Sequence, residues 1–253
     1  MKVVLFQQNI VWADPAANRA RLEQLFATAP KADLFVLPEM FTTGFATAPA
    51  GIAETSDESI RWMQAMAEKY DCAVAGSLAL EKDGKFYNHF AFVSAAGELA
   101  SYDKHHLFTY SGEHKTFSAG ESRCVVEWRG LRFMLIVCYD LRFPLWCRNQ
   151  KDYDAILCVA SWPQVRRYPW DTLLRARAIE NQAYVVAVNR VGDDPALHYN
   201  GGSVLLDPWG AELAVASDDK EEWICGEIDA ETLRAAAEKF PVLNDADAFS
   251  LKN

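Results

Sequence analysis

The sequence predicts a layered α/β fold whose sheets contain both parallel and antiparallel strands. Two observations lead to this prediction. Apolar stretches of strand length alternate along the chain with stretches in which apolar residues recur at helical spacing. Several strands also come in pairs joined by tight turns, which a simple doubly wound parallel sheet does not contain. No linker, repeat or low-complexity segment divides the 253 residues, so we expect one domain that spans 1–253.

Local signals delimit the elements in the first half of the chain. Asp14 followed by Pro15 is typical of a helix start, and the segment 55–58 has the spacing of a capping box that begins a second helix. The turn 82–84 separates two strands of a hairpin. The polar, glycine-containing segment 105–120 is predicted as a long functional loop. The expected strands are 2–10, 33–37, 72–80, 86–93 and 99–102, and the first helix is 15–29.

The central strand of the second half is the apolar run 131–138, which only Arg132 interrupts before it ends at Cys138. Such a run predicts a strand buried on both faces, and 123–128 is its hairpin partner. Pro144 suits the first turn of the helix that follows. Further along we expect strands 153–161, 183–189, 202–206, 212–216 and 223–228, helices 145–150, 170–182 and 230–240, and a tail, 241–253, that needs another surface to pack on.

The net charge of −10 and the pI of about 5.0 argue against nucleic acid and against an anionic membrane surface as partners. A small anionic substrate needs only a local basic pocket. No apolar run reaches about 18 residues, so no membrane span is expected. The N-terminal stretch 1–10 has neither the apolar region nor the cleavage site of a signal peptide.

The six cysteines indicate the redox compartment. A chain of this length does not need disulfides, and no pair has the CxxC spacing of a zinc site. We therefore expect a reduced cytoplasmic protein with free thiols and no metal. The cysteines are Cys72, Cys124, Cys138, Cys147, Cys158 and Cys225.

Three strand ends present a carboxylate, an amine and a thiol: Glu39, Lys104 and Cys138. Each has an ordinary explanation, as a solvated turn residue, a surface residue and a core residue. Ligands in sheets flanked by helices gather at the carboxyl ends of strands. Because all three residues occupy this kind of position, together they favour a functional site.

The segments around these residues resemble the three signature segments of the nitrilase superfamily of carbon–nitrogen hydrolases. They are 37–39 (LPE), 102–108 (YDKHHLF) and 138–144 (CYDLRFP), in the order that this family shows. The stretch 175–182 resembles the helix after the family's catalytic strand, and 207–210 its late turn. The resemblance covers nearly the whole chain. It implies an α-β-β-α sandwich, with two mixed sheets face to face and helices outside, and a Glu-Lys-Cys catalytic set.

The chemistry of that set follows from its residue types. A thiol with a pKa near ~8.5 needs a base or a cation to become a nucleophile. Glu39 is the candidate base. Lys104 and the backbone N–H of Tyr139 are candidates to stabilise the oxyanion that forms when the Cys138 thiolate attacks an amide. A thioester on Cys138 follows, and its hydrolysis requires neither a metal nor an organic cofactor.

The family often shows a further glutamate after the lysine, and Glu113 matches it. We expect Glu113 to position Lys104 or the substrate amide, although an exposed loop carboxylate has the same sequence signature. Asp140 and Arg142 are typical of the family as well. We expect them to pair and hold the turn after Cys138, with Glu180 as a third partner.

The segments 112–114, 160–163 and 177–184 look most like the omega-amidase branch, which implies a small-molecule substrate such as 2-oxoglutaramate or 2-oxosuccinamate. Such a substrate has a carboxylate at one end, so a cation should face it. Arg166 and Arg167 are the candidates, because arginine's planar fork suits a carboxylate. The candidate aromatic walls of the pocket are Phe41, Tyr110 and Trp162.

Alternatives remain open at this stage. The same catalyst can serve another substrate: an aliphatic amide, an N-carbamoyl amino acid or a nitrile. A Cys-His thiol hydrolase using His105, His106 or His114 would leave Glu39 idle, and a binding protein without activity would leave all three candidates idle. The resemblance also suggests a homo-oligomer, commonly a dimer formed through the helices at 144–150 and 170–182.

Overall fold

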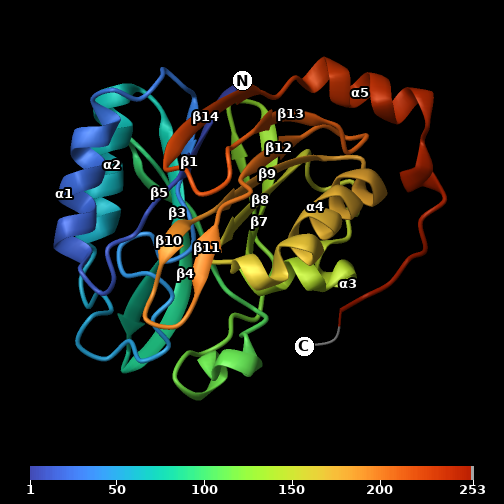
Figure 1. Ribbon diagram of the computed structural model, residues 1–253. Helices are drawn as coiled ribbons and strands as arrows, with labels where there is room; N and C mark the ends of the chain where they lie inside the picture. The colour runs from blue at the N-terminus through green and yellow to red at the C-terminus, as the bar shows by residue number, and fades with distance from the viewer. Residues whose placement is uncertain (252–253) are drawn as a thin grey trace.

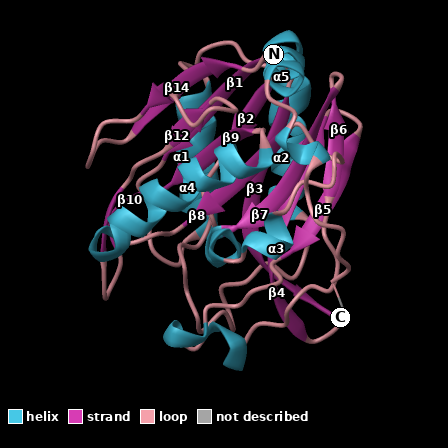
Figure 2. Ribbon diagram, turned by 90° about the vertical axis from the view of Figure 1, so that its right-hand side faces the viewer, coloured by secondary structure: helices cyan, strands magenta, loops and turns pink. Residues whose placement is uncertain are grey.

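The computed structural model, which describes residues 1–251, has four layers: two sheets packed face to face, with helices on both outer faces (Figures 1 and 2). This is the α-β-β-α sandwich that the resemblance implied, and the predicted fold class is confirmed. The first sheet contains β1 (Lys2–Gln7), β2 (Leu34–Val36), β3 (Ala73–Lys82), β4 (Lys85–Ser94), β5 (Gly97–Asp103) and β14 (Glu222–Glu227).

The second sheet contains β6 (Val125–Trp128), β7 (Leu131–Val137), β8 (Ala155–Ala160), β9 (Tyr184–Asn189), β12 (Val204–Leu206) and β13 (Glu212–Val215). The two sheets have the orders β14-β1-β2-β3-β4-β5 and β13-β12-β9-β8-β7-β6. In each sheet three adjacent strands run parallel, β1 to β3 and β7 to β9, and the outer strands are antiparallel. The mixture of hairpins and parallel crossovers in the sequence therefore produces two mixed sheets.

Side chains of successive strand residues enter different layers. In β1, Val3 and Leu5 belong to the core between the two sheets, whereas Val4 and Phe6 pack under the helices of the first sheet. Strands that are buried on both faces have no polar alternation. This explains why β7 reads as one apolar run in the sequence, and all of its residues except Leu131 and Arg132 are 0% exposed.

The outer layers are helical. The helices α1 (Pro15–Phe26) and α2 (Glu58–Tyr70) cover the first sheet, and α3 (Pro144–Cys147) and α4 (Arg167–Asn181) cover the second (Figure 1). The helix α5 (Ala230–Lys239) precedes the C-terminal segment, which Lys151 fastens through a 2.8 Å hydrogen bond from its Nζ to Asn244. None of these helices is long and apolar enough to cross a membrane.

One local expectation needs correction, and one hairpin was not predicted. The capping box at 55–58 does not form. The side chain of Asp57 makes no cap bond, and Glu54 accepts the N–H of Ser59 at 3.0 Å instead. The hairpin of β10 (Val191–Asp193) and β11 (His198–Asn200) was not expected, because its short polar strands lack an apolar pattern. This hairpin lies outside both sheets and supports one side of the candidate site.

Candidate active site

Cys138 follows the last residue of β7 and begins a 3-10 turn that runs to Arg142. Its backbone is in the left-handed region, with a φ of +47°, where a non-glycine residue is strained. Asp140 holds this turn, since its carboxylate accepts the N–H of Val137 at 2.9 Å and the hydroxyl of Tyr102 at 2.8 Å. These hydrogen bonds hold Cys138 in its strained backbone conformation and so set the direction of its side chain at the end of the strand.

The expected pairing of Asp140 with Arg142 is wrong. The other carboxylate oxygen of Asp140 accepts the N–H of His106 at 2.9 Å and lies 2.8 Å from Nδ1 of the same residue. Glu180, the expected third partner, pairs with Arg177 at 2.8 Å. The guanidinium of Arg142 turns the other way and lies 4.8 Å from the ring centre of Trp162, beside the cavity described below.

Glu39, Lys104 and Glu113 form one buried cluster, and all three are 0% exposed. Glu39 follows β2, Lys104 follows β5 directly, and Glu113 begins a 3-10 turn in the long loop. The Nζ of Lys104 donates to Oε1 of Glu39 at 2.8 Å and to Oε2 of Glu113 at 3.0 Å. The structure therefore brings together the candidate base, the cation and the further glutamate that the sequence singled out.

Burial and charge set the protonation of this cluster. Burial opposes the charged form of Lys104, but the carboxylates of Glu113 and Glu39 outweigh it and raise the pKa of the amine. Burial raises the pKa of Glu113, Lys104 opposes this change, and the charge of Glu39 adds to it. Lys104 is consequently a stable cation shared by two acids.

The surroundings of Cys138 favour the protonated form of its thiol. Although the residue is only half-buried, desolvation raises the pKa of its thiol well above the ordinary range, and the negative charge of Glu39 raises it further. Lys104 acts in the opposite direction. A thiol in this state needs a neighbouring base that takes its proton as it attacks.

Asn88, in β4, completes the cluster, and the sequence reasoning missed it. Its Nδ2 donates to Oε1 of Glu39 at 2.7 Å and to Oε1 of Glu113 at 3.2 Å, and the residue is 0% exposed. The hydroxyl of Ser77, in β3, donates to its Oδ1 at 2.8 Å, which fixes the orientation of the amide. The sequence signals were Ser77, within the mostly apolar stretch 73–80, and Asn88, which stands beside His89 in the strand 86–93.

Both oxygens of Glu39 are held from different parts of the fold. Lys104 and Asn88 donate to Oε1, and the backbone N–H of Ser161, directly after β8, donates to Oε2 at 2.8 Å. Donors on both oxygens leave the carboxylate little rotational freedom. Its position relative to Cys138 is thus set by both sheets.

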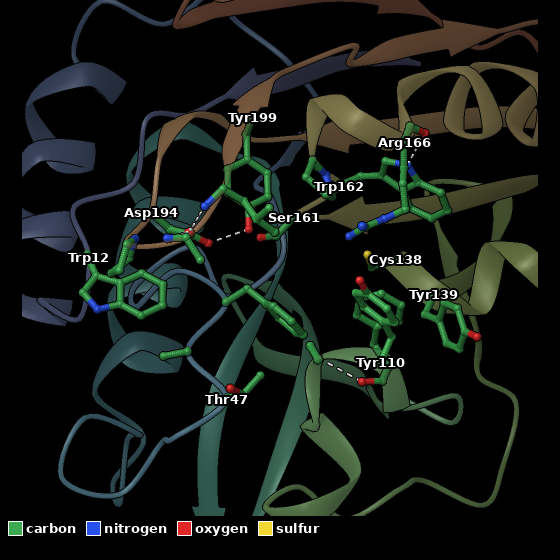
Figure 3. A pocket seen from close by; sticks show the side chains of 18 of the residues that line it. Trp12, Thr47, Tyr110, Cys138, Tyr139, Ser161, Trp162, Arg166, Asp194 and Tyr199 are labelled. Atoms are coloured by element: carbon green, nitrogen blue, oxygen red, sulfur yellow. Dashed lines mark hydrogen bonds between the residues drawn. The ribbon is translucent and has the colours of Figure 1, made fainter.

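A cavity of about 800 Å³ opens at the thiol of Cys138 (Figure 3). Of the predicted pocket residues, Tyr110, Trp162 and Arg166 line it, as does Tyr139. Two others do not. Phe41 is a core residue whose ring lies 6.0 Å from that of Trp62.

Arg167, the second arginine that we expected at the cavity, does not line it either. Its guanidinium donates to Asp171 and to Asp218, at 2.8 Å in each case. Arg142 takes its place among the lining residues. Because we expected Arg142 to form an ion pair with Asp140, we did not predict that it would line the cavity.

Two of the three candidate histidines of a Cys-His hydrolase, His105 and His106, are engaged elsewhere, and the third, His114, is exposed and does not line the cavity. Nδ1 of His105 lies 2.6 Å from the carbonyl oxygen of Gly120, and His106 contacts Asp140. Neither residue lines the cavity. In the part of the chain that the structure describes, no group of three or more His, Cys, Asp or Glu residues is arranged to hold a metal ion.

Comparisons with known proteins agree with this geometry. The sequence model of the family described as carbon-nitrogen hydrolase matches residues 2–238. A protein of Yersinia enterocolitica named omega-amidase YafV is 47% identical over 252 residues, which cover 99% of this chain and 98% of the relative. The 2-oxoglutaramate amidase of Bacillus subtilis (strain 168) is 36% identical over 249 residues, 94% of this chain and 95% of the relative.

A solved structure is similar over the whole fold. It is that of XC1258 from Xanthomonas campestris, described as a CN-hydrolase superfamily protein with an arsenic adduct in the active site. Its TM-score is 0.96 at 39% identity, and the match covers 100% of this chain and 99% of that one. The layers described above are therefore shared with an experimentally determined structure.

Proposed function

Because the chain belongs to the carbon–nitrogen hydrolase family and is an amide-hydrolysing enzyme, we propose that it hydrolyses small ω-amides of dicarboxylic acids such as 2-oxoglutaramate. The observation that carries this substrate class is a pair of cations at the cavity. Arg142 and Arg166 both line it, and in the described part of the chain neither pairs with a carboxylate.

We propose Glu39 as the general base and Cys138 as the nucleophile. Glu39 takes the thiol proton while the sulfur attacks the amide carbon. The oxyanion lies between the N–H of Tyr139 and the positive charge of Lys104, which Glu39 and Glu113 hold in place. Glu39 then gives the proton to the leaving nitrogen, ammonia departs, and a thioester remains on Cys138.

The second half of the reaction uses the same base. Glu39 removes a proton from water, which attacks the thioester carbon, and the proton returns to the departing sulfur of Cys138. The products are the dicarboxylic acid and the regenerated thiol. In this scheme Glu113 holds Lys104 in place, since it accepts from the Nζ through both of its oxygens, at 3.1 and 3.0 Å.

The arginines explain a preference for a carboxylate at the far end of the substrate. Arg142 lies against Trp162, and Arg166 lies 5.2 Å from the ring centre of Phe108, so aromatic faces support both guanidinium groups. Their donors remain open to the cavity. The protein is acidic overall, with a net charge of −10, so this local cationic patch is what attracts an anionic amide.

Ammonia release from 2-oxoglutaramate and from the neutral amide pentanamide tests the proposal. Arg142→Gln and Arg166→Gln should each raise KM for 2-oxoglutaramate, because a hydrogen bond to a charged group contributes about 1.5–3 kcal/mol, or roughly ten- to hundredfold. Their effect on pentanamide should be small. Arg167→Gln is the matched control and should keep the wild-type KM. A wild-type protein that hydrolyses pentanamide as readily as 2-oxoglutaramate contradicts the proposal.

We also propose a homodimer formed through the face that carries α3 and α4. Exposed apolar side chains support it: Leu145 is 61% exposed, Tyr168 81% and Ile179 53%. The six cysteines are all unpaired, which supports the cytoplasm as the place where the enzyme works.

A further inference from the structure

The cavity is larger than the substrate class requires. A volume of about 800 Å³ lies toward the upper end of the range for drug-sized ligands, about 300–1,000 Å³. An ω-amide with a five-carbon chain is much smaller than such ligands. Part of the cavity therefore stays empty when the substrate carboxylate is on the arginines and its amide is at Cys138.

Figure 3 shows that the cavity extends to both sides of Cys138. One side, which we call the cationic arm, carries Tyr110, Tyr139 and Arg166. The other side, which we call the aromatic arm, carries Trp12 and Tyr199 together with the turn that connects β10 and β11. The turn between β10 and β11 adds the apolar side chains of Pro195, Ala196 and Leu197 to this arm, and other apolar residues that line the cavity are Phe45, Ala46 and Ile52.

Two polar groups of the aromatic arm, the hydroxyl of Tyr199 and the carboxylate of Asp194, are already engaged. The carboxylate of Asp194 accepts the hydroxyl of Tyr199 at 2.6 Å through one oxygen, and the N–H groups of Ala196 and Leu197 at 2.7 Å through the other. The buried guanidinium of Arg190 lies over the ring of Tyr199, 4.6 Å from the ring centre. The arm thus offers mainly aromatic and aliphatic surface to a ligand.

The position of the base indicates which end of a substrate points into this arm. Glu39 must reach the leaving nitrogen, and its Oε2 is bound to the N–H of Ser161. In Figure 3 Ser161 lies between Cys138 and Tyr199. The charge of Glu39 also contributes to the raised pKa of Tyr199, after burial and Asp194. The leaving nitrogen therefore faces the aromatic arm when the carboxylate occupies the cationic arm.

We propose that the enzyme also hydrolyses N-substituted ω-amides, whose apolar arylalkyl or alkyl group on the amide nitrogen occupies the aromatic arm. This inference rests on the proposed function, because the substrate carboxylate must still bind in the cationic arm. The bonds change as for the primary amide. The C–N bond breaks as the C–S bond to Cys138 forms, and the thiol proton passes through Glu39 to the nitrogen of the departing amine. Water then releases the acid, so no further reactant is needed.

The test compares glutaramate with N-benzylglutaramate, with ammonia and benzylamine as the measured products. The wild-type protein should release benzylamine with a kcat/KM within about tenfold of that for glutaramate. Trp12→Ala should raise KM for the benzyl amide by about tenfold or more and leave glutaramate unchanged. Ala196→Trp, which fills the arm, should abolish benzylamine release and keep ammonia release. Trp209→Ala, at an exposed tryptophan that does not line the cavity, is the matched control.

The outcomes separate the two proposals. Hydrolysis of glutaramate without hydrolysis of the benzyl amide overturns this inference and leaves the proposed function intact. Failure to hydrolyse either compound, or 2-oxoglutaramate, overturns the proposed function itself. If Trp12→Ala and Ala196→Trp change both substrates equally, the aromatic arm does not hold the nitrogen substituent and the inference is wrong.

Discussion

Replacement of Asn88 by leucine should impair the chemical step while leaving substrate binding intact. The change keeps the side-chain volume but removes the donors to Glu39 at 2.7 Å and to Glu113 at 3.2 Å. A hydrogen bond to a charged group contributes about 1.5–3 kcal/mol, so loss of the shorter bond alone should lower kcat by roughly ten- to hundredfold. KM should stay within about twofold, because Asn88 does not line the cavity.

The isosteric change Asn88→Asp should give a distinct signature. It places a third carboxylate against Glu39 and Glu113 around the single cation of Lys104. Like charges favour the protonated forms of neighbouring acids, so the acidic limb of the kcat–pH profile should move to higher pH. A purely structural role for Asn88 would not shift this limb.

Steady-state kinetics of both variants from acidic to alkaline pH, together with thermal unfolding, checks these expectations. Asn181→Leu is the matched control. It removes a buried amide that bonds the N–H of Asn149 at 2.9 Å and the carbonyl oxygen of Arg177 at 3.0 Å, so it should lower Tm but not kcat. Wild-type kcat in Asn88→Leu, or an unshifted profile in Asn88→Asp, would refute the positioning role.

Two further predictions concern stability. Burial opposes the charged form of His89, but hydrogen bonds to Asp103 and Glu98 outweigh it and raise its pKa from 6.5 to about 9. Since the unfolded chain releases this proton first, the free energy of unfolding in urea should fall as pH rises from 6.5 to about 9; an equal fall in His89→Gln would contradict this. Asp140→Ala should destabilise the fold by about 3–5 kcal/mol and lower Tm by roughly 10 °C, because it leaves buried donors such as the Val137 N–H unpaired. Differential scanning calorimetry checks the second prediction, with Asp140→Asn as the milder control.

The sequence predicts those parts of the site that lie at strand ends. Cys138 was recognisable because a parallel strand buried on both faces reads as an apolar run, and the residue after such a run lies at the ligand-binding edge. Glu39 and Lys104 follow strands in the same way. In each case the local sequence pattern predicts that the residue lies at the end of a strand. The resemblance to a family indicated that the three residues act together.

The parts that were missed depend on tertiary contacts. Asn88 is an ordinary strand residue in the sequence, and only the pairing of β3 with β4 and the folding of the long loop place it beside two glutamates. Asp140 and Arg142 are close in sequence and opposite in charge, which suggests a pair. The 3-10 turn sends their side chains in different directions, toward His106 and toward Trp162.

The hydrogen bond between Ser161 and Glu39 joins residues 122 positions apart and connects the end of β8 in one sheet with the end of β2 in the other. Glu39, the proposed general base, is therefore oriented only after the two halves of the sandwich have docked. During refolding, recovery of activity will lag behind formation of either sheet, because loop closure over such a separation is slow compared with local pairing. A nascent or partly unfolded chain consequently carries the proposed nucleophile without an oriented base, so hydrolysis is expected to begin only when the whole sandwich has closed.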